Sequence, residues 1–174
     1  MKQLVKSSLK TGTLLFMASI ILNTGCEQNA PDYSRELMPK ADKLVAAWNG
    51  GSLDVLDPLF DANFIRKVNQ QPDVFGVEGF KKAITDFRMA YPDLKLTIDN
   101  EVYGENAMAV RWVLTGTNTG PGDMPPTGKS INIWGESIIH LANGKIIKEI
   151  VAYNNQKLIE QLGFTMTTLS EETK

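Results

Sequence analysis

Few residues of this 174-residue chain have the types and spacing that catalysis requires. The chain contains one histidine, His140, so a Ser-His-Asp or Cys-His arrangement would depend on that single ring. Trp134, Glu136 and His140 alternate along one segment, which places them on the same face of a strand. If that face lines a cavity, Glu136 could serve as a base. If it faces solvent, Glu136 and His140 are surface residues of no catalytic importance.

Other kinds of catalytic site lack their motifs. No serine stands in a Gly-x-Ser-x-Gly elbow. No group of histidines, cysteines or acids has the spacing of metal ligands. The glycines of segment 120–128 are mixed with prolines, which suits a rigid connection between strands better than a phosphate-binding loop. We therefore expect no metal and no cofactor.

The first 25 residues have the pattern of an export signal. Three lysines flank or precede an apolar segment, 11–22, that is too short to span a bilayer. The segment ends in Leu22-Asn-Thr-Gly-Cys26, which resembles the lipid-attachment sequence of bacterial lipoproteins, although Asn23 stands where leucine is usual. An ordinary secretory signal followed by an unpaired thiol is the alternative. We expect a lipid on Cys26 and an anchor to a membrane of the bacterial cell envelope.

Length, charge and composition argue for one domain behind this signal. The net charge is −2, and removal of the three lysines of the signal makes it −5. A mildly acidic chain without a basic stripe gives no reason to expect nucleic acid as a partner. We divide the chain into a lipoprotein signal peptide, a tether, one domain with a sizeable core and a polar tail, at 1–25, 26–32, 33–164 and 165–174.

Hydrophobic periodicity changes midway along the domain. Helical spacing of apolar residues predicts helices at 39–48, 52–56 and 76–91, with Pro39 in the first turn of the first helix. Alternating residues then predict strands from Leu94 onward, at 107–119, 129–141 and 145–153, with a tight hairpin turn at 142–144. A short helix that ends at Gly163 follows. Helices followed by an antiparallel meander indicate the α+β class.

Five motifs in this order resemble the SnoaL-like family, the polyketide and ester cyclases of the nuclear transport factor 2-like superfamily. They are Gly76-Val-Glu-Gly-Phe80, Tyr91-Pro-Asp-Leu94, Val110-Arg-Trp112 with Gly116-Thr-Asn118, Pro126-Thr-Gly-Lys129, and the closing strand and helix from Gly144 to Gly163. The resemblance covers nearly all of the domain. It implies a cone-shaped, curved antiparallel sheet packed on three N-terminal helices, with a cavity at the mouth of the cone.

The same resemblance locates the site and shows substitutions in it. The family's catalytic aspartate corresponds to Asn154, or to its neighbour Asn155 if the register differs by one residue, and the tryptophan four residues earlier corresponds to Ile150. The family's histidines correspond to Asn118 and to a position near Lys67 or Asn69. An amide has no titrating group and cannot take a proton from carbon as a carboxylate does. The resemblance therefore implies a pocket that binds rather than one that cyclises.

We accordingly expect a binding module for a small apolar or aromatic molecule. An enzyme of cyclase, isomerase or hydrolase type with another acid, such as Glu136, is one alternative, and a homodimeric interaction module is another. No catalytic residue is assigned; Glu136, Asn154 and His140 are candidates. The expected ligand-binding residues are aromatic, amide or aliphatic and comprise Trp48, Asn69, Phe87, Tyr91, Asn118, Trp134, Ile150 and Asn154.

The lipid anchor predicts where the protein is found in cell fractions. The native protein is expected in the membrane fraction, and Cys26→Ala is expected to be soluble or to remain unprocessed. Because one acyl chain holds a protein only marginally, two or three chains are expected on the mature residue. Immunoblots of separated membrane and soluble fractions check this, and equal solubility of the two forms would contradict it.

Overall fold

The computed structural model describes residues 31–165. The signal peptide 1–25, Cys26, most of the tether and the tail beyond Thr165 lie outside the described residues. Residues 31–165 belong to one compact unit. Within 31–165, no helix is both long enough and apolar enough to cross a membrane.

The described residues form short and long helices around six strands. The helical elements are α1 (Ser34–Trp48), the single 3-10 turn η1 (Leu53–Leu56), α2 (Gly76–Ala90) and α3 (Asn155–Gln161). The strands are β1 (Phe60–Val68), β2 (Val74–Phe75), β3 (Lys95–Gly104), β4 (Ala107–Thr117), β5 (Ser130–Ala142) and β6 (Lys145–Tyr153). The α+β class is therefore confirmed.

The strands make one curved sheet with the order β2-β1-β6-β5-β4-β3. The expected antiparallel meander is present from β3 to β6. The sheet as a whole is mixed rather than antiparallel, because β1 pairs with β6 in the parallel direction. Antiparallel pairing follows from tight hairpins between consecutive strands, and β1 and β6 are separated by most of the domain.

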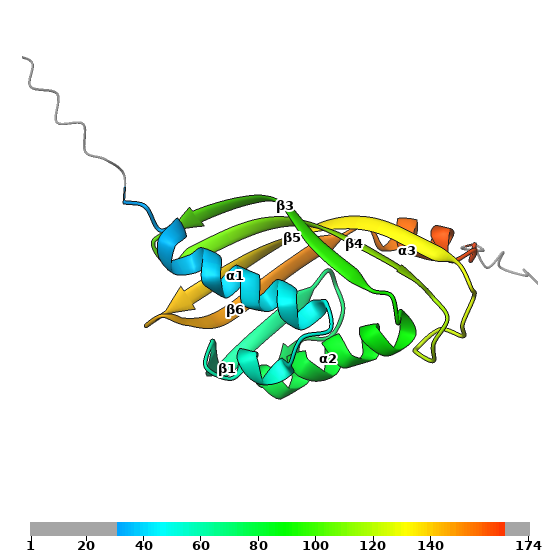
Figure 1. The fold of residues 1–174 in the computed structure, drawn as a ribbon, viewed down its shortest axis with the longest axis horizontal. Helices are drawn as coiled ribbons and strands as arrows, with labels where there is room; N and C mark the ends of the chain where they lie inside the picture. Colours follow the sequence, from blue (N-terminus) through cyan, green and yellow to red (C-terminus); the bar gives the residue numbers. More distant parts are fainter. Residues whose placement is uncertain (1–30, 166–174) are drawn as a thin grey trace, which may run out of the picture. The chain divides into compact units, whose positions relative to one another are not determined.

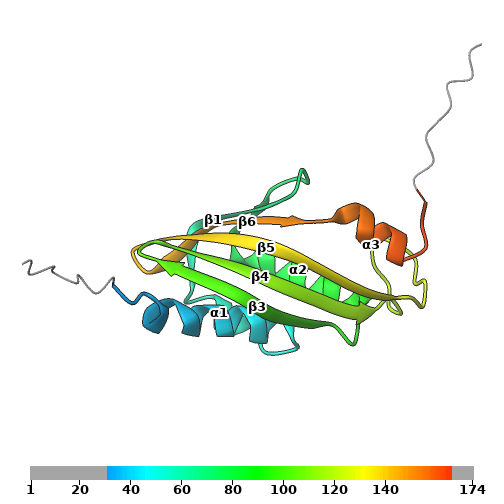
Figure 2. The same ribbon diagram turned by 90° about the horizontal axis from the view of Figure 1, so that it is seen from above.

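The two long helices lie on the concave face of the sheet. Figures 1 and 2 show α1 and α2 on this one face, with α1 beside β3 and α2 beside β1. The short α3 follows β6 and packs near β5. The convex face of the sheet carries no helix along most of its length, so side chains on the two faces have different surroundings.

Helix α1 begins earlier than the sequence predicts. We expected Pro39 in the first turn, but the helix starts at Ser34 and Pro39 lies inside it. Asp32 explains the earlier start, because its carboxylate accepts a hydrogen bond from the backbone N–H of Ser34 at 3.1 Å. The missing N–H of Pro39 removes one hydrogen bond from the helix, which the surrounding contacts tolerate.

Two turn sequences have clear structural roles. Asn143 and Gly144 both have positive φ, 50° and 72°, as the tight β5–β6 hairpin requires. At the α2–β3 junction, Asp93 accepts hydrogen bonds from the backbone N–H and the hydroxyl of Thr117, at 2.6 and 2.7 Å. These two bonds lower the pKa of the Asp93 carboxyl and attach the junction to the end of β4.

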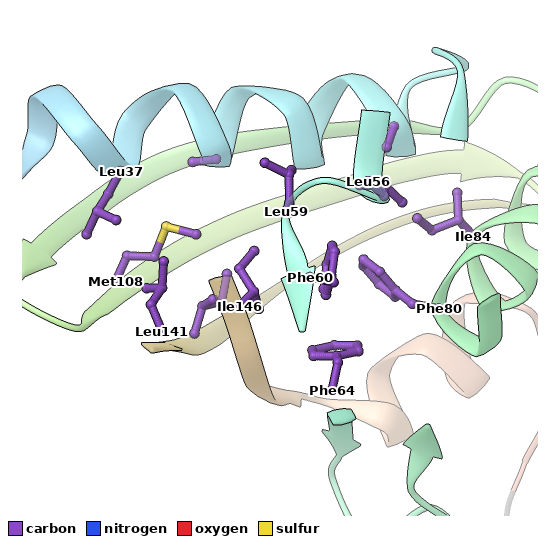
Figure 3. Packing of buried hydrophobic residues seen from close by; sticks show 13 residues of the cluster. Leu37, Leu56, Leu59, Phe60, Phe64, Phe80, Ile84, Met108, Leu141 and Ile146 are labelled. Carbon is purple, nitrogen blue, oxygen red and sulfur yellow. The ribbon is translucent and has the colours of Figure 1, made fainter. Parts of the chain in front are cut away.

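The core beneath α1 and α2 is built around three phenylalanines. Figure 3 shows Phe60, Phe64 and Phe80 facing one another, and their ring centroids lie 4.5 to 5.9 Å apart. A second group of buried apolar residues, which includes Leu114, Leu158 and Leu162, lies toward α3. The cavity described below is lined by residues of both groups.

Candidate functional site

A cavity of about 450 Å³ lies between α1, α2 and the inner face of the sheet. The charged residues of its rim are the exposed Lys82 and the partly exposed Asp86 of α2, and the exposed Asp123 of the loop after β4. Most of the wall is aliphatic or aromatic, and the six aromatic residues are Trp48, Phe80, Phe87, Tyr91, Trp112 and Tyr153.

Strand β5 shows why the inner face of the sheet is apolar. From Ser130 to Ile139 its residues alternate strictly between exposed and buried positions. Ile133, Ser137 and Ile139 are buried and line the cavity. Trp134 and Glu136 are exposed and lie on the opposite, convex face.

Gly135 makes room for a large side chain on the inner face. A Cβ atom at this position would overlap the Trp112 ring on the neighbouring strand, because it would lie only 2.4 and 2.5 Å from two of the ring carbons. The ring therefore lies over the glycine, where its indole N–H donates to the hydroxyl of Ser137 at 3.1 Å. It also contacts Tyr153 on the other side, at a centroid distance of 6.1 Å. Trp112, Ser137 and Tyr153 form the floor of the cavity.

Aromatic rings from both helices form the facing wall. The Trp48 ring meets Phe80 and Phe87 edge to face, at centroid distances of 6.2 and 5.7 Å. Phe87 in turn stacks on Tyr91 at 6.1 Å. Such contacts fix ring orientations and leave apolar ring surface toward the cavity.

An ion pair supplies most of the cavity's internal charge. Arg66 on β1 donates from Nε to Oε2 of Glu149 on β6 at 2.8 Å, and both side chains are only 12% exposed. The guanidinium carbon of Arg66 lies 5.9 Å from the Trp48 ring and 5.3 Å from the Phe80 ring, in cation–π geometry. Both charged residues line the cavity.

Two phenols, those of Tyr91 and Tyr153, also line the cavity. Burial raises the pKa of Tyr153, while a hydrogen bond with Gln71 and the charge of Arg66 oppose that rise. Burial also raises the pKa of Tyr91, and Tyr153 adds to the effect. Both phenols therefore stay protonated at neutral pH and can donate a hydrogen bond.

Four of the expected ligand-binding residues line the cavity, namely Trp48, Phe87, Tyr91 and Asn118. The amide of Asn118 is already engaged. Its oxygen accepts from the backbone N–H and hydroxyl of Thr127, at 2.8 and 3.0 Å, and its nitrogen donates to the Ala90 carbonyl at 3.4 Å. Asn118 thus attaches the loop after β4 to the end of α2, at the edge of the cavity.

The other four expected residues lie elsewhere. Asn154 is exposed and begins α3, where its side-chain oxygen accepts the Lys157 backbone N–H at 2.9 Å. Trp134 is 55% exposed on the convex face, and Ile150 pairs with Ile138 on that same face. Asn69 does not line the cavity either. Its side-chain nitrogen donates to the Tyr153 carbonyl and its side-chain oxygen accepts from the Tyr153 backbone N–H, each at 3.2 Å, so Asn69 positions Tyr153, which does line the cavity.

The remaining catalytic candidates are on the convex face. Glu136 is exposed opposite Arg111, and His140 is partly exposed further along β5. Arg111 bonds Asp99 at 2.5 Å and stacks over the Trp134 ring at 4.9 Å, so it joins neighbouring strands. Within residues 31–165, no three histidine, cysteine or acidic side chains are grouped in a way that could hold a metal ion.

Sequence reasoning missed Arg66, Gln71, Glu149 and Tyr153. For Glu149 and Tyr153, the reason is a bulge in β6. Register with β5 shifts between His140, which pairs with Lys148, and Leu141, which pairs with Ile146, so Ile147 is an extra residue. One extra residue exchanges the two faces of a strand. Only the run of Glu149, Val151 and Tyr153 at alternate positions could have indicated an inner face beyond the bulge.

The role of Asn154 as a helix cap can be tested by stability. Asn154→Ala is expected to lower the free energy of unfolding by about 1 kcal/mol, because it leaves a backbone N–H of α3 without its partner. Asn154→Asp should be close to neutral, since aspartate caps equally well. Urea unfolding followed by circular dichroism measures both, with the exposed neighbour Asn155→Ala as control. Equal stability of Asn154→Ala and the native protein would contradict the cap.

Comparison with known proteins agrees with this architecture. Residues 41–162 match the family model described as SnoaL-like polyketide cyclase. A candidate SnoaL-like polyketide cyclase from a Jannaschia species superposes with a TM-score of 0.71 at 17% identity, over 80% of this chain and 99% of that one. TsrD from Streptomyces laurentii superposes with a TM-score of 0.68 at 24% identity, over 77% and 98%.

A candidate polyketide cyclase from Bacillus cereus gives a TM-score of 0.61 at 25% identity, over 74% of this chain and 80% of that one. None of the curated proteins matches the sequence. The family match covers most of the domain, and the solved structures share its curved sheet and helices. The chain belongs to the SnoaL-like polyketide cyclase family.

Proposed function

We propose that the protein binds a small apolar or aromatic molecule in the cavity between the helices and the sheet. The observation that carries this proposal is the cavity itself, about 450 Å³ in volume and walled by six aromatic residues with few polar groups. Ligand sites in proteins are typically concave, mostly apolar and of this size. The lipid expected on Cys26 would keep this binding at the cell envelope.

The positions of the candidate acids support binding over proton abstraction. Asn154, which corresponds to the family's aspartate by resemblance, is exposed and occupied as a helix cap. Glu136 faces solvent on the convex side. Glu149 does line the cavity, but Arg66 holds its carboxylate. A carboxylate oxygen that already accepts a hydrogen bond from a guanidinium is engaged with that partner and is not free to approach a C–H bond of a ligand.

Filling the cavity tests the binding proposal. The native protein should bind a neutral, environment-sensitive fluorophore such as N-phenylnaphthylamine with a rise in its emission. Ala83→Phe adds a ring to the cavity wall beside Phe87 and is expected to weaken binding at least tenfold. Fluorescence titration measures the affinity of each form.

Thr85→Phe provides the matched control, because it adds the same ring to an exposed position of the same helix. It should bind as the native protein does. Circular dichroism establishes that all three forms are folded. Failure of the native protein to bind, or unchanged binding by folded Ala83→Phe, would refute the cavity as the binding site.

A proton-transfer enzyme is the second candidate, and the placement of Glu149 in the cavity is the observation that favours it. Proton abstraction by a positioned base contributes roughly 10²–10⁴-fold to a rate. Under the binding proposal we expect no enolate-dependent deuterium exchange into small ketoesters above the buffer rate, as followed by mass spectrometry. Exchange that is lost in Glu149→Gln but retained in Glu136→Gln would instead establish the enzyme.

The convex face supports association with a second copy. Val102, Ala109, Ile138 and Ile150 lie in register across four strands, and Val102 and Ile138 are 65% and 46% exposed. A two-fold dimer would place this apolar row against itself. Sedimentation velocity should show a dimer that dissociates in Ile138→Lys, whereas Thr97→Lys, exposed on β3, should leave it intact. A monomer at all concentrations would contradict this.

A further inference from the structure

The charged groups inside the cavity cancel one another. Of the charged residues that line it, Lys82, Asp86 and Asp123 belong to the rim, where Lys82 pairs with Asp86 at 2.7 Å in solvent. The interior contains Arg66 and Glu149, one positive and one negative. The interior of an apolar site therefore carries no net charge.

Part of the Arg66 guanidinium remains available to donate hydrogen bonds to a ligand. Its Nε donates to Glu149, and the structure of residues 31–165 shows no hydrogen bond from either of its two terminal nitrogens. The two aromatic rings beside it restrict the orientation of the guanidinium plane. The phenol of Tyr153, which is close enough to Arg66 for its charge to act on the phenol's pKa, is a second donor at this end of the cavity.

We propose that the Glu149–Arg66 pair selects the charge of the ligand, so that the cavity accepts an uncharged molecule with an acceptor oxygen and rejects a carboxylate. This inference rests on the proposed binding function. An uncharged acceptor such as a carbonyl or ether oxygen can take hydrogen bonds from Arg66 and Tyr153 without adding charge. Glu149 is then a specificity residue that acts through Arg66.

The physical reason is the cost of an unpaired charge in an apolar site. A carboxylate ligand beside Arg66 would bring a second negative charge close to Glu149, and one of the two would remain without a positive partner. An uncompensated charge in such surroundings is expensive, whereas a hydrogen-bonded neutral group is not. Without Glu149, the same guanidinium would become a site for a carboxylate, which it can bind through two parallel hydrogen bonds.

A purely structural role for the pair is the competing explanation. Arg66 and Glu149 are direct partners across the parallel β1–β6 pairing, so their ion pair could serve only to join these strands. That role would affect stability but would not change which ligands bind. The charge preference of binding is therefore the measurement that separates the two explanations.

Three naphthalenes substituted at the same ring carbon test the native protein by isothermal titration calorimetry at neutral pH. They carry an ethyl, an acetyl or a carboxylate group. We expect the acetyl compound to bind best, the ethyl compound next and the carboxylate at least tenfold more weakly than the acetyl compound. Equal or tighter binding of the carboxylate would overturn the inference while leaving the binding function intact. Failure of all three to bind would overturn both.

Variants then assign the preference to Glu149. Glu149→Gln keeps the side-chain shape and should raise the affinity for the carboxylate compound, relative to that for the acetyl compound, at least tenfold. The double variant Arg66→Gln with Glu149→Gln should show no such gain, because the guanidinium is absent. Thermal unfolding with and without each compound establishes that the variants fold, and the carboxylate should raise the Tm of Glu149→Gln more than that of the native protein.

An unchanged preference in folded Glu149→Gln, or the same gain in the double variant, would show that the pair is structural only. If Glu149→Gln does not fold, the native titration and the folded double variant still decide whether the pair selects the charge of the ligand. The double variant should bind the acetyl compound more weakly than the native protein because it has lost the Arg66 donor. Native-like affinity of the double variant for that compound would overturn the inference.

Discussion

The site depends on the position of one strand, β6, between a parallel neighbour and an antiparallel one. Pairing with β1 places Glu149 directly beside Arg66, and pairing with β5 places Tyr153 beside Gly135 and hence near Trp112. The extra residue Ile147 turns Glu149, Val151 and Tyr153 toward the concave face. Without it, the period of two would turn this segment's other residues inward and leave the cavity without its charged pair.

A second set of contacts holds the helices around the space that they enclose. The guanidinium of Arg88 on α2 donates to carbonyl oxygens of Ala47 and Gly51 at the end of α1, the latter at 2.8 Å. Asn49, just past α1, pairs its amide with both backbone polar groups of Leu96 on β3, at 2.8 and 2.7 Å. These polar links satisfy helix-end carbonyls and a sheet edge, and they add to the apolar contacts by which Leu37 and Ala41 pack α1 on the core.

Local patterns were sufficient for most of the fold but not for the site. The helical spacing before Pro92 and the alternation after it predicted the order of elements, the Asn143-Gly144 hairpin and the α+β class, because these features depend on neighbours in sequence. The pairing of β1 with β6 and the bulge at Ile147 depend on distant strands, and no local pattern specifies them. Residues that were predicted from helices, such as Trp48 and Phe87, therefore line the cavity, whereas those predicted from β6, Ile150 and Asn154, do not.

The polar groups around the cavity are largely satisfied by one another. The Trp112 indole donates to Ser137, the Asn118 amide binds Thr127 and Ala90, and Tyr153 interacts with Gln71. Buried polar groups that already have partners do not need a ligand to compensate for lost water. A molecule that enters would thus gain mainly from apolar contact with the aromatic walls, and its shape would matter more than hydrogen bonds. The ion pair of Arg66 and Glu149 is where a polar group on the ligand would have the largest effect, since charge interactions are strong in apolar surroundings.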